Sequence, residues 1–149
     1  MSQGRFEELD VNLKTWIEFQ INEGSQMLRN LAGEDEEASI LLGLLDEAFS
    51  NALGQEWDEE MVTTILNCIG VNFGQYLVDR VGFEWWIVED EYGRDLAVVA
   101  CRGRGDVTVY PIDFIAKRWD RKEDYFLEDA FRKIVTTVEK VKSEWRERE

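Results

Sequence analysis

The chain has 149 residues, a formal net charge of -15 and an apolar content of 44%, with six tryptophans and eight phenylalanines. This length fits a single domain covering residues 1–149, and the apolar content argues for a folded core rather than a disordered acidic chain. The chain has no histidine, which removes the commonest general base and a usual zinc ligand, and the negative charge disfavours binding of nucleic acid.

Two helices are expected in the first third of the chain. Apolar residues at steps of three and four predict one helix from Leu13 to Leu31, with Gly33 as its stop. The same spacing predicts a second helix from about Asp35 to Ala52. The acids at its predicted start would suit the positive end of the helix dipole.

A third helix completes the predicted helical part, residues 8–81. Asp58 is a suitable N-cap for its first backbone amides, and Gly82 ends it. Gly70 and Gly74 lie one turn apart inside this helix, although glycine lowers helix propensity. Their spacing predicts a flat strip against which another element packs closely.

The hydrophobic period then changes from 3.6 to 2, which predicts three strands within residues 83–110. They run from Phe83 to Glu89, from Arg94 to Cys101 and from Val107 to Tyr110, and short turns join them. The middle strand is apolar on both faces, as expected of a central strand.

Two more helices are expected within residues 111–146. Pro111 suits the first turn of a short helix over residues 112–119. Heptad-like apolar spacing predicts the last helix from Leu127 to Trp145. The predicted fold is therefore α+β, with N-terminal helices, a three-stranded antiparallel meander, and C-terminal helices packed on the sheet.

The acidic stretch, residues 30–79, carries eleven acids and no lysine or arginine. Three explanations remain open: acids that start helices and keep the protein soluble, a docking surface for a basic protein, and a divalent-cation site. The absence of interspersed bases favours the docking surface. The candidate partner-binding residues are Glu34, Asp35, Glu36, Glu37, Asp46, Glu47, Glu56, Asp58, Glu59 and Glu60.

Other residues could complete such an interface. Trp57 and Trp86 are candidate aromatic anchors, because interfaces gather binding energy on buried aromatic side chains. The basic island, defined here by four candidate residues, either pairs with the acidic stretch or forms a second contact surface. Its members are Arg102, Arg104, Lys117 and Arg118.

Support for catalysis is thin. Cys68 and Cys101 form no C-x-x-C pair and are expected to be buried thiols. The triplet from Glu89 to Glu91 could hold a metal, but such a triplet is expected by chance among thirty-two acids. We therefore expect no catalytic residue, no metal and no cofactor.

Several short motifs after Gly82 resemble an uncharacterised bacterial family, a domain of unknown function. They are W-I-V-E-D-E-Y-G at residues 86–93, Y-P-I at residues 110–112 and A-K-R at residues 116–118. The preceding helix with Gly70 and Gly74 is also similar. The resemblance covers about Asp58 to Val138, implies a bacterial source and brings no known activity.

These observations predict a small acidic protein-binding module, most specifically a bacterial immunity protein that neutralises a basic toxin or effector. The alternatives are an acidic secretion chaperone and, with least support, a carboxylate-dependent enzyme. The first ten residues lack the apolar core of a signal peptide, and no run approaches the length of a membrane span. The expected protein is cytoplasmic, a monomer or homodimer, with a basic protein as partner and neither nucleic acid nor membrane.

Overall fold

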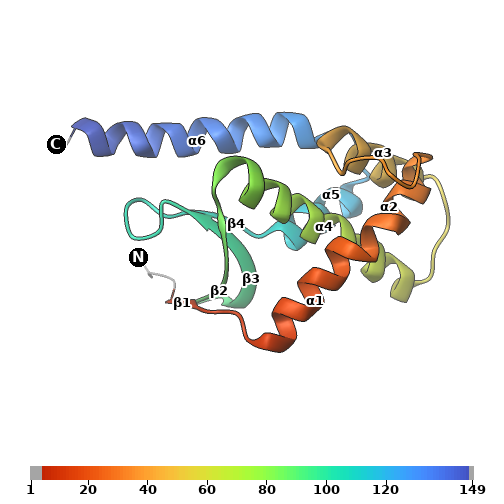
Figure 1. The fold of residues 1–149 in the computed structure, drawn as a ribbon, viewed down its shortest axis with the longest axis horizontal. Helices are drawn as coiled ribbons and strands as arrows, with labels where there is room; N and C mark the ends of the chain where they lie inside the picture. The colour runs from red at the N-terminus through yellow and green to blue at the C-terminus, as the bar shows by residue number, and fades with distance from the viewer. Residues whose placement is uncertain (1–4, 148–149) are drawn as a thin grey trace.

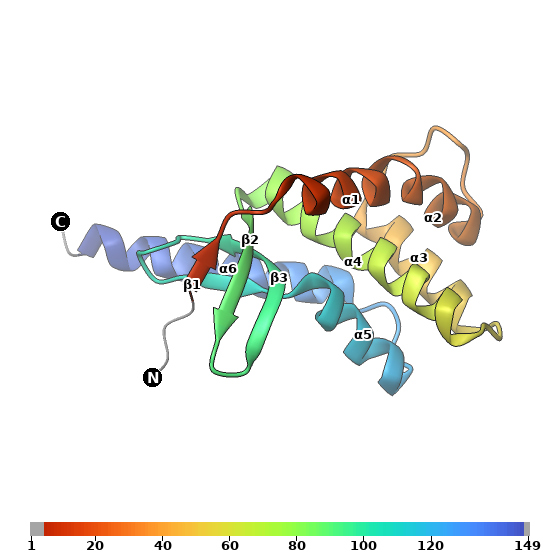
Figure 2. The ribbon, with the colours of Figure 1, turned by 90° about the horizontal axis from the view of Figure 1, so that it is seen from below.

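The computed structural model describes residues 5–147, which form an α+β fold around one long central helix. That helix, α4 (Glu59–Val81), contacts α1 (Val11–Asn22), α2 (Gly24–Ala32), α3 (Leu42–Leu53) and α5 (Pro111–Arg121). It also contacts the sheet through β3, and Figures 1 and 2 show it between the other helices and the sheet. The last helix, α6 (Leu127–Glu147), runs along one side of the molecule (Figure 1).

The sheet has four antiparallel strands, where the sequence predicted three. The expected meander is present as β2 (Glu84–Asp90), β3 (Gly93–Ala100) and β4 (Val107–Val109). The additional strand, β1 (Arg5–Glu7), pairs with β2 and places Phe6 opposite Val88. A three-residue strand is too short to show a hydrophobic period, so the sequence pattern could not reveal it.

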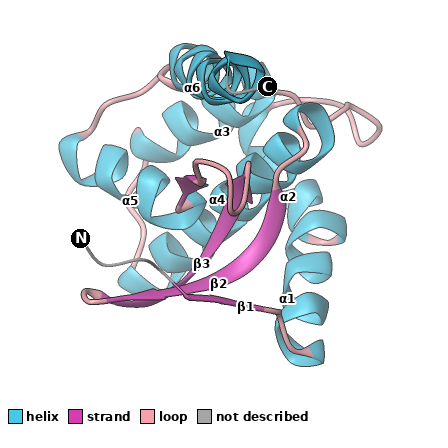
Figure 3. Ribbon diagram, turned by 90° about the vertical axis from the view of Figure 1, so that its left-hand side faces the viewer, coloured by secondary structure: helices cyan, strands magenta, loops and turns pink. Residues whose placement is uncertain are grey.

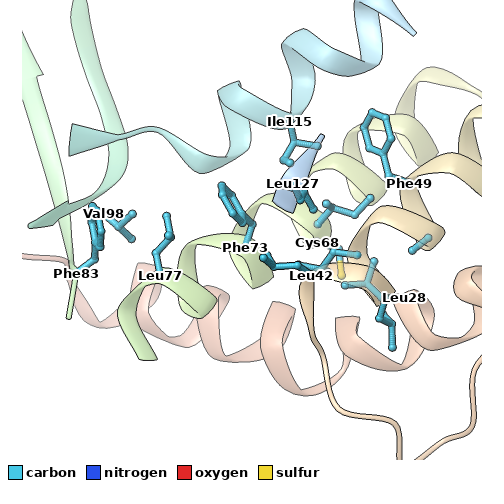
Figure 4. Packing of buried hydrophobic residues seen from close by; sticks show 14 of the residues in the cluster. Leu28, Leu42, Phe49, Cys68, Phe73, Leu77, Phe83, Val98, Ile115 and Leu127 are labelled. Carbon is cyan, nitrogen blue, oxygen red and sulfur yellow. The ribbon is translucent and has the colours of Figure 1, made fainter. Parts of the chain in front are cut away.

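The core joins residues from α2 to α6 in one cluster (Figure 4). Phe49 of α3, Phe73 of α4 and Ile115 of α5 are fully buried within it. On the sheet side, Phe83 and Val98 continue the same cluster. Residues 96–100 of β3 are all buried, which agrees with the prediction of a central strand that is apolar on both faces.

The first predicted helix is divided in two at Glu23, between α1 and α2. At Gly24, a Cβ atom would lie 2.6 Å from the Sγ atom of Cys68 on α4, so only glycine fits this close approach. The predicted stop at Gly33 is confirmed, because this residue ends α2 in a left-handed conformation with φ of 72°.

The second helix begins later than predicted, at Leu42 instead of about Asp35. Residues 34–41 form a loop, and the Ala38 carbonyl accepts a hydrogen bond of 2.7 Å from Nε of Arg29. That contact holds the carbonyl in a non-helical position, so the acids before it are not first-turn residues of α3. The apolar stripe of this helix, including Leu45 and Phe49, is buried as predicted.

The third helix matches its prediction closely. Asp58 accepts a 2.8 Å hydrogen bond from the Met61 amide and so caps α4, and Gly82 ends the helix with φ of 92°. At Gly70, a Cβ atom would lie 2.6 Å from the Ile112 Cα atom of α5, and at Gly74 one would lie 2.5 Å from the Trp85 ring. The predicted strip of close packing is therefore present.

The C-terminal helices pack only in part on the sheet, where the sequence predicted both of them. The main neighbour of α5 is α4, and the beginning of α6 packs against α3. The end of α6 lies beside the β3–β4 loop, where the Trp145 indole donates a hydrogen bond to the Arg104 carbonyl. Figure 3 shows α6 above the sheet, with α1 along its side.

Candidate functional site

The acidic stretch is divided between the two ends of α3. The acidic loop, Glu34–Glu37, precedes α3, whereas residues 56–60 follow it and enter the first turn of α4. A helix of 12 residues separates them by about 18 Å of helix axis. The two groups of acids therefore lie at opposite ends of α3, whose place in the fold Figure 1 shows.

None of these acids forms an ion pair with a side chain of residues 5–147. All members of the acidic loop and all acids of residues 56–60 are exposed. The ion pairs of the described chain use carboxylates outside the stretch: Glu7, Glu89, Asp113 and Asp129. The charges of these exposed acids are consequently not neutralised by ion pairs within residues 5–147.

A groove of about 1020 Å³, called the α3 groove here, brings three of the predicted residues together. Glu34 from the loop lines it with Asp46 and Glu47 from the first turns of α3. Tyr125, which is 58% exposed, donates a 3.0 Å hydrogen bond from its hydroxyl to Glu47. Leu41, which is 44% exposed, adds an apolar side chain to the lining.

Asp46 has a role inside the fold that the sequence did not reveal. Its side chain is buried, and its Oδ1 atom accepts a 3.2 Å hydrogen bond from the Leu127 amide, at the start of α6. Burial raises the pKa of this carboxyl to about 6, and the negative charges of Glu128 and Asp124 add to the rise. Asp46 was predicted to contact a partner directly. In the structure its carboxylate instead joins α3 to α6.

The basic island does not pair with the acidic stretch among the described residues. Arg102 lies 4.3 Å from the centre of the Trp86 ring, Arg104 lies 4.1 Å from Trp145, and Arg118 lies 4.0 Å from Phe114. Lys117 pairs with Asp113 one turn earlier on α5. The sequence left open whether the basic island pairs with the acidic stretch or forms a second contact surface, and the first possibility is wrong for residues 5–147.

The two candidate aromatic anchors are both half-buried. Trp57 packs against the core, and its indole donates a 2.9 Å hydrogen bond to the Ala52 carbonyl at the end of α3. Trp86 meets Phe6 edge to face and lies beneath Arg102. Its indole Nε1 atom is buried without a hydrogen-bond acceptor in the described chain.

A second groove, of about 630 Å³, was not found by sequence reasoning. This α1–β2 groove lies between α1, the end of α4 and the beginning of β2. Its apolar lining includes Leu9, Ile17 and Trp85. The residues come from three distant segments, so no local pattern marks the groove. The sequence signal nearest to it is Gly74, which makes room for the Trp85 ring.

The part of the chain that the structure describes contains no group of three His, Cys, Asp or Glu residues able to hold a metal ion. In the acidic triplet, Glu89 pairs with Arg5, and Asp90 accepts a hydrogen bond from the Tyr92 amide in the hairpin turn. Cys68 is buried, and burial raises its pKa to about 12, so its thiol is not activated as a nucleophile.

The helix α4 is long and apolar enough to cross a membrane when judged by length and composition alone. From the sequence, no such segment is expected. Half of its most apolar window is buried inside the protein, where α4 serves as the central helix. A core helix of a folded domain passes the same test, so this property carries no weight for a membrane role.

The residues that carry the family resemblance come together on the sheet and α5. Val88, Asp90 and Tyr92 from the hairpin line a pocket of about 530 Å³ with Tyr110 and Lys117. Searches of curated proteins and of solved structures found no match to this chain. The model of one protein family, described as a domain of unknown function (DUF3806), matches residues 45–131. The resemblance to an uncharacterised domain family is thereby confirmed, and the chain belongs to this family.

Proposed function

We propose that this protein is a binding module whose acidic surface docks a basic protein partner. The observation that carries the proposal is that residues 30–79 hold eleven acids, no base and no ion pair within the described chain. Soluble proteins usually intersperse acidic and basic residues on their surface, so solubility alone does not require a stretch of acids without a base. A one-signed surface accelerates association with a partner of opposite sign.

The acidic loop and the α3 groove form the part of this surface best suited to recognition. Exposed carboxylates from Glu34 to Glu37 lie beside a groove that also offers Leu41 and Tyr125. A tyrosine within a charged rim matches the composition of interface hot spots, and the leucine adds apolar area beside it. The groove would hold an anchor residue while the loop attracts the charge of the partner.

The most specific form of the proposal is an immunity protein that neutralises a basic toxin or effector. Toxins that act on nucleic acids or other anionic substrates carry a positive surface, and an acidic inhibitor gains speed and affinity from covering it. The proposal predicts that the gene beside this one encodes a basic toxin-like protein. Co-expression of the two proteins should restore growth that the neighbour alone prevents.

Two matched variants test whether the acidic loop performs the docking. The loop variant carries Glu34→Gln, Asp35→Asn, Glu36→Gln and Glu37→Gln. The control variant makes the same change in net charge at exposed acids elsewhere, Glu91→Gln, Glu123→Gln, Glu139→Gln and Glu144→Gln. The association rate with the neighbouring gene product should fall at least about tenfold for the loop variant and no more than about threefold for the control.

The second measurement is the dependence of binding affinity on salt concentration. The affinity should weaken steeply between about 50 and 500 mM NaCl, because screening removes long-range attraction between exposed charges. Equal effects of the loop and control variants, or an affinity that does not depend on salt, would contradict electrostatic docking on the acidic loop.

A further inference from the structure

The α1–β2 groove combines an apolar floor with a negative rim. Leu9 and Ile17 are buried at its base, beside the half-buried Ile21 and Trp85. Four exposed carboxylates line it, and Lys14 is the only base among its lining residues. The acids are Glu8, Glu18, Asp79 and Glu84.

Hydrogen bonds hold two of the lining side chains in place. The indole N–H of Trp85 donates a 3.0 Å hydrogen bond to Oε1 of Gln75, and the amide nitrogen of Gln75 donates one of 2.9 Å to Asp79. The Cη2 and Cζ2 atoms at the edge of the Trp85 ring lie over Gly74, where a Cβ atom would collide with them. The aromatic floor and one carboxylate of the rim are thus fixed relative to each other before any ligand arrives.

The distribution of the acids indicates the kind of ligand. Within residues 5–147 no three acidic side chains converge closely enough to hold a metal ion, so the charges of the rim are spread along the groove. Glu8, Glu18 and Glu84 make no ion pair in the described chain. Spaced negative charges around an apolar floor complement a ligand that carries spaced positive charges and apolar side chains between them.

We infer that the α1–β2 groove binds a short amphipathic basic segment of a partner protein, with lysine or arginine at the rim and an apolar side chain on Trp85. A volume of about 630 Å³ accommodates a few side chains, which is the size of a peptide anchor site. The rim shares Asp79 with the acidic stretch but contains no residue of the acidic loop, so failure of the groove variant and failure of the loop variant are distinguishable outcomes.

The probe for the test is a synthetic amphipathic peptide of lysine and leucine residues, titrated into the full chain at about 150 mM NaCl. The groove variant carries Glu8→Gln, Glu18→Gln and Glu84→Gln, all exposed positions. Its matched control carries Glu91→Gln, Glu123→Gln and Glu139→Gln, exposed acids outside both the groove and the acidic loop, with the same change in net charge. The groove variant should bind the peptide about tenfold more weakly, and the control should bind within about threefold of the unmodified protein.

Two further peptides separate specific docking from general attraction to a negative protein. A peptide in which serine replaces every leucine should bind at least about tenfold more weakly, because the apolar floor would be left uncovered. A peptide in which glutamate replaces every lysine should not bind. If the serine peptide binds as tightly as the leucine peptide, or if both triple variants weaken binding equally, the inference is wrong.

The site itself can be located by NMR. The six tryptophans provide indole N–H signals, and a Trp85→Phe variant assigns the signal of Trp85. Binding in the groove should shift the Trp85 signal and leave that of Trp145, on α6, unchanged. A shift at Trp145 or Trp57 with none at Trp85 would place the peptide elsewhere and overturn the inference.

Discussion

Asp46 illustrates how one residue can belong to two parts of the protein. Its carboxylate faces the start of α6, accepts a hydrogen bond from Leu127 and also lines the α3 groove. The first backbone amides of a helix lack intrahelical partners, and an acceptor from another element can satisfy them as well as a local cap. The side chain therefore links the packing of α6 to the acidic surface.

The raised pKa of Asp46 predicts how stability depends on pH. Because its folded-state pKa of about 6 exceeds the ordinary value of 3.8, folding favours the protonated carboxyl. The stabilisation is complete below the ordinary value and is lost as the pH rises towards 6. An Asp46→Asn variant, which keeps an acceptor without the charge, should be more stable than the unmodified protein by about 1–2 kcal/mol near pH 7.

Urea denaturation across this pH range measures the difference, which should disappear below about pH 4. An Asp46→Ala variant is the control, since it removes the acceptor for the Leu127 amide as well as the charge. It should be less stable than Asp46→Asn at every pH, by about 1 kcal/mol. A constant difference between Asp46→Asn and the unmodified protein from acid to neutral pH would contradict the argument.

At the scale of elements, α4 determines how the molecule is assembled. It contacts α1, α2, α3, α5 and β3, and its two interior glycines allow α5 and the Trp85 ring of β2 to approach its backbone. Glycine lowers the stability of an isolated helix by about 1 kcal/mol relative to alanine. The close packing at Gly70 and Gly74 offsets that loss, because a side chain at either position would push a neighbour away.

A pair of substitutions tests this account of α4. Gly70→Ala should destabilise the protein by about 2 kcal/mol, because the added Cβ atom would lie 2.6 Å from the Ile112 backbone, which cannot turn aside as a side chain could. Gly43→Ala on α3 is the matched control, since nothing lies within 4 Å of the added atom. It should be neutral or stabilising by about 0.5 kcal/mol.

The measurement is the free energy of unfolding of both variants in urea, with helix content followed by circular dichroism. The two substitutions are chemically identical, so helix propensity alone predicts the same sign for both. A Gly70→Ala variant that is as stable as Gly43→Ala would show that α4 and α5 can separate without loss, and that the glycine is not needed for their packing.

At the scale of the whole molecule, charge is distributed unevenly. The acidic stretch supplies eleven negative charges with no base, while the four residues of the basic island lie against aromatic rings and Asp113. Like charges held close together in the folded state repel one another. The protein therefore tolerates some self-repulsion among the acids of the acidic stretch.

This repulsion predicts a dependence of stability on salt. Raising NaCl from about 20 mM to about 500 mM should increase the free energy of unfolding by on the order of 1 kcal/mol, because screening weakens repulsion between exposed charges. The loop variant should show a smaller increase than the control variant with four acids neutralised elsewhere. Urea is the suitable denaturant because it adds no ions, and a stability that falls with added salt would contradict the prediction.

Those parts of the fold that depend on neighbours within a few positions could be read from the sequence. The Asp58 cap, the stop at Gly82 and the apolar stripe of α4 are set by local hydrogen bonds and by the 3.6-residue period. The meander of β2, β3 and β4 follows from alternation and short turns in the same way. The late start of α3 was missed because it depends on a contact between Arg29 and Ala38.

The candidate sites required the tertiary structure. By itself, the sequence determined that this protein has an α+β fold, a negative net charge and no histidine. It also determined that a run of acids without a base lies between Asn30 and Asp79. Only the folded chain decided that Glu34–Glu37 lie in a loop before α3, that Asp46 caps a helix 81 positions away, and that Glu8 and Glu84 border one groove. The physical reason is that charge and hydrophobic period are properties of a segment, whereas a groove exists only where distant segments pack together.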